Sequence, residues 1–185
     1  MTRNAEDAPT PTPPSAPPRG LLVVADTSVL INFLVVGRMD LIARYARRVL
    51  VTDHVGAEIT STYPDQRQHY EDALAAGAVE ELRVDSDAEL ALFGRLATPG
   101  RLGTGECSAI AVAVLRRHAL AIDDRRATRE AKVLDPALEV LGTQSVMVEM
   151  LRQGLIAVAD ADVLLTEWAG KHRFKLRIAS FADVM

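Results

Sequence analysis

The chain is poor in the residues on which several common protein classes depend. Its 185 residues include one cysteine, Cys107, so an internal disulfide framework is excluded and a reducing compartment is expected. Aromatic residues make up only 4% of the chain, and acids outnumber bases to give a net charge of −4. The core must therefore be mainly aliphatic, and bulk charge alone would not hold the protein to nucleic acid.

Long uninterrupted apolar runs are also missing. The most apolar stretch, residues 21–36, is interrupted by Asp26 and Asn32 and falls short of the ~20 residues that span a bilayer. The residues before it carry acids and many prolines, unlike the basic start of a signal peptide. The sequence therefore predicts a cytoplasmic protein without membrane contact. Residues 1–20 are expected to form a disordered proline-rich tail, and residues 21–185 one domain.

What the chain does contain is an alternation of short apolar runs and amphipathic segments. The apolar runs predict strands near residues 21–25, 49–51, 79–84, 119–122 and 140–141, with helices between and after them. Runs that are apolar throughout are typical of strands buried on both faces. This order predicts a three-layer α/β/α sandwich with a central, mainly parallel sheet.

Carboxylates occur where several of these strands end or where a following helix begins. They are Asp26 after the first strand, Glu58 in the helix after the second, Glu106 after a Gly-rich loop, and Asp123 and Asp124 after the fourth strand. Because strand ends and the starts of the following helices share one edge of a parallel sheet, these side chains are expected to converge. Any one of them alone could be a helix cap or a solvated residue.

Several carboxylates at one edge require compensation. Two of them ~4 Å apart repel by ~4 kcal/mol at an effective dielectric constant of ~20. A divalent cation would offset that repulsion, and ligands that are all oxygen favour Mg²⁺ or Mn²⁺ over zinc. The four histidines show no ligand spacing. The residues therefore predict a Mg²⁺ or Mn²⁺ site at this edge.

In this order the acidic motifs resemble the PIN domain, in particular the VapC-like ribonuclease toxins. The resemblance covers roughly residues 21–156 and rests on Asp26-Thr27-Ser28, Val55-Gly56-Ala57-Glu58-Ile59, Gly105-Glu106-Cys107-Ser108-Ala109-Ile110-Ala111 and Asp123-Asp124-Arg125-Arg126-Ala127. It implies a PIN-like fold and a metal-dependent endoribonuclease that acts on RNA. It also implies a small antitoxin protein as a partner, and often a homodimer.

The resemblance assigns roles to the acidic residues. It implies four catalytic carboxylates, namely Asp26, Glu58, Glu106 and Asp124, with Glu106 where many of these toxins carry Asp. Metal ligation would fall to Asp26, Glu106 and the Asp123–Asp124 pair. Asp124 is the better match within that pair, and Asp123 could be a ligand, a support or a cap. Glu58 would orient the attacking water or bind a second ion.

Two further groups of residues lie beside the acids in the sequence. Thr27 and Ser28 follow Asp26, and the resemblance implies that they support it. Positive charge for RNA phosphates is expected after Asp124 and near the C-terminus, from Arg125, Arg126, Arg129, Lys171 and Arg173. The alternative for any one of these cations is a solvated helix surface.

Other proteins that place an Asp after the first strand fit less well. A phosphatase of the haloacid dehalogenase class normally carries a second Asp two positions later, where this chain has Ser28. A response-regulator receiver needs an acidic pair beside its first strand, and only Asp26 is there. The Gly-rich loop at 100–107 lacks the Gly-Lys-Ser/Thr end of a P-loop. The remaining alternative is a catalytically inactive PIN-like module that binds RNA or a protein.

Overall fold

Five parallel strands form the centre of the molecule. The computed structural model describes residues 21–59, 63–98 and 100–185, so the tail predicted at 1–20 lies outside the described residues. The strands are β1 (Leu22–Ala25), β2 (Arg48–Thr52), β3 (Val79–Leu82), β4 (Ala119–Ala121) and β5 (Val140–Leu141). Their spatial order is β3-β2-β1-β4-β5, and each neighbouring pair is parallel. The predicted parallel sheet is confirmed.

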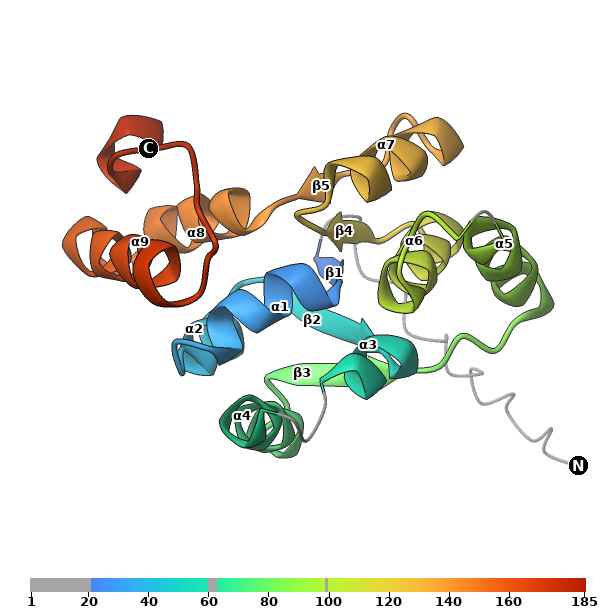
Figure 1. Ribbon diagram of the computed structural model, residues 1–185, viewed down its shortest axis with the longest axis horizontal. Helices are drawn as coiled ribbons and strands as arrows, with labels where there is room; N and C mark the ends of the chain where they lie inside the picture. The colour runs from blue at the N-terminus through green and yellow to red at the C-terminus, as the bar shows by residue number, and fades with distance from the viewer. Residues whose placement is uncertain (1–20, 60–62, 99) are drawn as a thin grey trace, which may run out of the picture.

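Helices connect and follow the strands (Figure 1). They are α1 (Thr27–Leu34), α2 (Met39–Arg44), α3 (Asp53–Glu58), α4 (Pro64–Ala75), α5 (Asp87–Ala97), α6 (Thr104–Arg116), α7 (Arg125–Leu134), α8 (Thr143–Arg152), α9 (Val158–Lys171) and the 3₁₀ helix η1 (Phe181–Val184). None of the helices within the described residues is long and apolar enough to cross a membrane.

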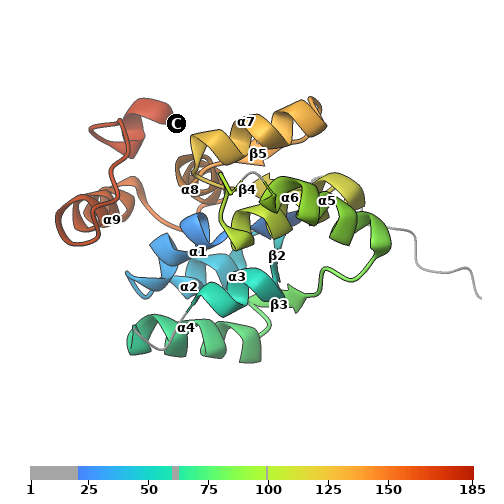
Figure 2. The same cartoon turned by 45° about the vertical axis from the view of Figure 1, so that its right-hand side comes forward.

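The two faces of the sheet are covered by different helices because side chains alternate along each strand. Val23 and Ala25 of β1 join a core cluster that also holds side chains of α1, α2, α4, α8 and α9. Val24, between them, joins a second cluster with side chains of α6 and α7, against which α5 also packs. The two groups of helices lie on opposite sides of the strands in Figures 1 and 2. The predicted three-layer α/β/α fold is therefore confirmed.

Polar residues at the ends of the strands start the helices. The side chains of Asp26, Thr52 and Asp124 accept hydrogen bonds from backbone N–H groups in the first turns of α1, α3 and α7. Of the neighbours Thr52 and Asp53, the threonine is the cap of α3. These caps place the starts of three helices at the carboxyl edge of the sheet, where ligands bind in open α/β folds.

The helix α9 is fastened to α1 by one buried tryptophan. The indole N–H of Trp168 donates to the backbone carbonyl of Asn32 at 2.7 Å. Its ring meets those of Phe33 and Phe174 edge to face, with centroids 6.2 and 5.8 Å away. Because Trp168 is fully buried, this contact fixes the C-terminal part of the chain against the helix that begins at Asp26.

Candidate active site

Asp26 is the most buried of the acidic residues at the carboxyl edge, with 2% of its surface exposed. Its Oδ2 accepts a hydrogen bond from the Ser28 N–H at 2.9 Å. Its Oδ1 is buried and has no hydrogen-bond partner among the described residues. Burial raises the pKa of Asp26, the hydrogen bonds with Ser28 lower it, and the negative charge of Glu58 raises it. A carboxylate oxygen left in this state is the group that a cation would satisfy.

Glu58 is held from two sides by neighbouring elements. Its Oε2 accepts from the Thr27 hydroxyl at 2.5 Å, and its Oε1 accepts from the Gly105 N–H at 2.7 Å. The first contact joins α3 to the start of α1, and the second joins it to the start of α6. Thr27 therefore contacts Glu58, whereas the neighbouring Ser28 contacts Asp26.

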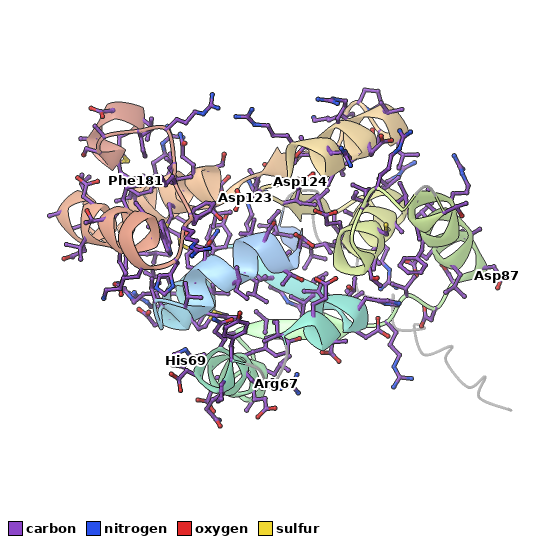
Figure 3. The ribbon with its side chains drawn as sticks, viewed as in Figure 1. Arg67, His69, Asp87, Asp123, Asp124 and Phe181 are labelled. Carbon is purple, nitrogen blue, oxygen red and sulfur yellow. The ribbon has the colours of Figure 1, made fainter. Side chains whose placement is uncertain are left out.

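The end of α3 that carries Glu58 is also fixed from α4. The guanidinium of Arg67, labelled in Figure 3, donates to the carbonyl oxygens of Ile59 and Gly56 at 3.2 and 3.5 Å. Carbonyls at a helix C-terminus lack partners within the helix, and a cation satisfies them. Arg67 thereby restrains the backbone on both sides of Glu58.

Glu106 lies in the first turn of α6 and faces the other carboxylates. Its Oε2 accepts from the Gly103 N–H at 2.8 Å. Burial raises the pKa of Glu106, the bond with Gly103 lowers it, and the negative charges of Asp26, Asp124 and Glu58 raise it further. Asp26, Asp124 and Glu58 therefore lie close enough to Glu106 for their charges to act on it.

Asp123 and Asp124, side by side in the sequence, have different surroundings (Figure 3). Asp124 is exposed, and its Oδ1 accepts from the N–H groups of Arg126 and Ala127, both at 2.8 Å. Asp123 accepts from Thr143 with both oxygens, from the N–H at 2.8 Å and from the hydroxyl at 2.6 Å. Burial raises the pKa of Asp123, and the bonds with Thr143 lower it. Asp124 therefore faces the open edge, whereas Asp123 is bound inward to the start of α8.

Asn32 joins Asp123 to α1, and no sequence motif identified Asn32 as a functional residue. Its amide nitrogen lies 3.2 Å from Asp123 Oδ2, 3.0 Å from Thr143 Oγ1 and 3.0 Å from the Ser28 carbonyl. The Ser28 hydroxyl in turn accepts from the Asp123 N–H at 3.1 Å. The sequence signal that could have found Asn32 is its place among the apolar residues of α1. A polar side chain buried there is almost always hydrogen-bonded.

Replacing Thr143 with Val is expected to lower the free energy of unfolding by ~2–3 kcal/mol, because Asp123 loses the hydroxyl donor of a fully buried residue. Thr143 is fully buried, and Val has nearly its shape. Urea unfolding measures the effect. The matched control is Thr143→Ser, which keeps the hydroxyl and should cost only ~1 kcal/mol for the lost methyl group. A Val variant as stable as the Ser variant would contradict this account of Asp123.

The five acidic side chains fall into two sets by their free oxygens. Both oxygens of Glu58 and of Asp123 accept hydrogen bonds from the protein. Asp26, Glu106 and Asp124 each leave one oxygen, Oδ1, Oε1 and Oδ2 respectively, without a donor among the described residues. No three His, Cys, Asp or Glu side chains in the described ranges lie close enough to enclose an ion by themselves. Free oxygens on several carboxylates fit Mg²⁺ or Mn²⁺, because Mg²⁺ usually keeps several of its waters and needs only one or two carboxylates.

The basic residues expected to contact RNA lie on two elements. Arg125, Arg126 and Arg129 are exposed on α7, directly after Asp124, and Arg126 also donates to the Arg101 carbonyl at 3.2 Å. Lys171 and Arg173 lie at and beyond the end of α9, where Lys171 forms an ion pair with Glu167 at 2.9 Å. Arginines 125 and 129 and Arg173 are thus the more available of the five cations.

A family model described as DUF3368: PIN domain matches residues 22–180. A comparison with curated protein sequences found no match. Among solved structures, a PilT N-terminus domain protein from the hyperthermophilic archaeon Sulfolobus solfataricus P2 is 15% identical, with a TM-score of 0.48. That likeness covers 70% of this chain and 93% of the archaeal one.

Proposed function

This chain belongs to the PIN-domain family, whose members are generally nucleases, and from that premise we propose that it is a cytoplasmic ribonuclease dependent on Mg²⁺ or Mn²⁺. The observation that carries the proposal is the buried, unpartnered Oδ1 of Asp26 at an edge shared with three further carboxylates. A cofactor other than a cation would need hydrogen-bond donors or positive charge of its own to offset the negative charge of these carboxylates. The acidic edge instead fits a hard cation and, through it, a phosphate.

Each acidic residue has a distinct part in the proposed reaction. The free oxygens of Asp26, Glu106 and Asp124 would hold the ion, either directly or through waters bound to the ion. The chemistry that a divalent ion supplies is a lower pKa of a bound water and neutralisation of charge on the phosphate. Glu58 is fixed by Thr27 and Gly105 and would orient the attacking water. One of its carboxylate oxygens would then accept a hydrogen bond from that water in place of its present donor.

Asp123 has the hydrogen bonds of a positioning residue. The sequence resemblance left it as a ligand, a support or a cap, and both its oxygens are engaged by Thr143. Together with Asn32 it ties the end of β4 to α1 and α8. We therefore assign Asp123 the part of fixing Asp124 relative to Asp26.

Two finer proposals concern substrate and partners. Arg125, Arg126 and Arg129 would contact RNA phosphates beside the acidic edge, since arginine binds phosphate well and phosphate contacts position a nucleic acid. The likeness of the motifs to VapC-like toxins supports a small antitoxin protein that blocks the site, and a homodimer. The distinguishing signature of a toxin would be loss of cleavage when that antitoxin is added.

A cleavage assay with purified full-length protein tests the proposed function. A labelled single-stranded RNA should be cut internally in Mg²⁺ or Mn²⁺ and left intact in EDTA. In the same buffers, thermal unfolding should shift upward with the metal, by an amount that corresponds to ~2.7 kcal/mol at 100 times its Kd. RNA binding without cleavage in any metal would overturn the proposal and favour the inactive binding module.

A further inference from the structure

In the segment after α9, exposed and partly buried side chains alternate, and the acidic site does not explain this pattern. From Arg173 to Ile178 the sequence alternates cation and apolar residue, with Arg173, Lys175 and Arg177 exposed. The residues between them, Phe174, Leu176 and Ile178, are partly buried and pack against the core cluster that contains α1, α8 and α9. We call residues 173–178 the cationic strip. Its alternation is that of an extended segment with one face on the protein and one in solvent.

Both ends of the cationic strip are anchored. At the start, the Phe174 N–H donates to the Trp168 carbonyl at 3.1 Å. Beyond its end, the Asp162 carboxylate on α9 accepts from the Ser180 hydroxyl at 2.6 Å and from the Phe181 N–H at 2.8 Å. Phe181, labelled in Figure 3, is fully buried. The three cations are thus displayed from a backbone that is already ordered, which lowers the entropic cost of binding a ligand.

The cations of the strip are available for a ligand. Residues 171–182 contain no Asp or Glu. Within the described part of the chain, none of Arg173, Lys175 and Arg177 forms an ion pair. Successive cations along an extended segment are ~6.6 Å apart, at ~3.3 Å per residue. The alternation of exposed and partly buried residues therefore places three positive charges in succession along the surface.

A short chain of contacts joins the strip to the acidic edge. Phe174 packs on Trp168, Trp168 donates to Asn32, and the Asn32 amide reaches Asp123. In Figure 1 the strip, drawn in red beyond α9, lies to the left of β5, whereas α7 lies to its right. The strip and α7 are thus separate elements, and in this view they lie to either side of β5.

We propose that the cationic strip binds the backbone phosphates of single-stranded RNA and holds the substrate near the acidic edge, to which the contacts through Trp168 and Asn32 join it. The proposal rests on the proposed ribonuclease function for its choice of RNA. A linear row of charges matches one strand, and the apolar side chains of the strip point inward, where they contact no base. Binding by the strip should therefore be electrostatic and independent of base sequence.

Salt dependence of RNA binding measures the contribution of the strip. The probe is a fluorescein-labelled oligouridine, with affinity measured by anisotropy for the full-length protein in EDTA, where no cleavage occurs. Each phosphate contact to a single strand contributes about 0.7 to the slope of log K against log salt. The variant R173N/K175Q/R177Q should therefore lower the magnitude of the slope by about 2 and weaken binding at low salt. Asn is used at 173 because Arg173 has a φ of +56°, which Asn tolerates.

The matched control is R83Q/R95Q/R117N, which removes three exposed arginines away from the strip and changes the net charge equally. Asn is again used at 117, because Arg117 has a φ of +57°. Its slope should stay close to that of the wild type. Equal slopes in the two triple variants would overturn the proposal, as would a strip variant that binds like the wild type. If the strip variant melts at a lower temperature, the conservative variant R173K/R177K is measured as well. Because it keeps the positive charges, it must keep the wild-type slope.

Two further measurements separate this proposal from its premise. If the wild type cleaves RNA and the strip variant keeps the wild-type salt slope, the proposal for the strip is wrong and the ribonuclease function stands. Absence of cleavage by the wild type would contradict the proposed ribonuclease function. A difference in salt slope between the wild type and the strip variant would then still support RNA binding by the strip. A poly-glutamate peptide that competes with oligouridine at equal charge concentration would show that the strip takes acidic protein instead, and would overturn the proposal.

Discussion

Replacing Asp26 with Asn is expected to lower metal-dependent RNA cleavage by about a thousandfold, equal to about 4 kcal/mol of transition-state stabilisation. The reason is local, because Oδ1 of Asp26 is the one buried carboxylate oxygen at this edge without a protein donor among the described residues. An amide is neutral and a weaker ligand for a hard cation. Single-turnover cleavage of labelled RNA at saturating enzyme measures the loss, and wild-type rates from the variant would contradict the assignment of Asp26.

The same variant should keep its fold and gain stability in metal-free buffer. Asn is as good a helix cap as Asp, so the bond from the Ser28 N–H to residue 26 is retained. The substitution also removes a buried negative charge that is repelled by Glu58. Thermal unfolding in EDTA at neutral pH should therefore give a higher Tm for Asp26→Asn than for the wild type, and Mg²⁺ should reduce that difference.

The pH dependence of stability follows from the direction of the Asp26 shift. Because burial raises the pKa of Asp26 above 3.8, the folded protein retains this proton at pH values where the unfolded chain has lost it. The free energy of unfolding contributed by this group therefore falls as pH rises through that interval, and is constant above the folded pKa. In EDTA, the wild type should lose stability over this interval relative to Asp26→Asn. Parallel curves for the two proteins would show that Asp26 does not titrate as the structure implies.

Replacing Gly105 with Ala is expected to lower cleavage by ten- to a hundredfold without unfolding the protein. A Cβ atom at residue 105 would lie 2.6 Å from Oε2 and 2.9 Å from Oε1 of Glu58, closer than such atoms approach. The carboxylate is the end of a flexible side chain, so it moves away and loses its bond with the Gly105 N–H. Because Ala favours a helix over Gly by ~1 kcal/mol, the backbone of α6 has no reason to unwind.

The matched control for Gly105 lies two residues before it. At Gly103 an added Cβ would have its nearest neighbours at 3.8 and 3.9 Å, which is ordinary contact. Gly103→Ala should therefore keep near wild-type cleavage, and it adds the same methyl group at the start of the same helix. Comparable losses in the two variants would mean that the start of α6, rather than the position of Glu58, controls activity. Equal urea midpoints would show that neither substitution acts through global stability.

Local sequence pattern was sufficient for most of the architecture. The apolar runs at β1 and β5 end where the structure ends the strand, and those at β2 and β4 end within one residue of it, since a run buried on both faces must stop where the chain turns toward water. The run predicted at 79–84 gives a shorter β3, because the residues after Leu82 leave the sheet. The 3₁₀ helix at Phe181–Val184 was not predicted, since four residues are too few to show a helical period.

The acidic positions were also readable from sequence, because a parallel sheet collects strand ends at one edge. Asp26 and Asp124 directly follow or closely follow their strands and cap the next helix. Glu58 was the weakest of these predictions, since nothing local in α3 selects it. Its two partners, Thr27 and Gly105, are 31 and 47 residues away in the chain.

Sequence by itself thus determined which residue types gather at the carboxyl edge, since periodicity and strand order are local properties of the chain. Only the tertiary structure decided how those residues differ. Asp26 keeps a free oxygen, whereas Asp123 gives both of its oxygens to Thr143, 20 residues away, and contacts Asn32, 91 residues away. A hydrogen bond depends on distances of a few tenths of an ångström between distant segments, and no local pattern records them.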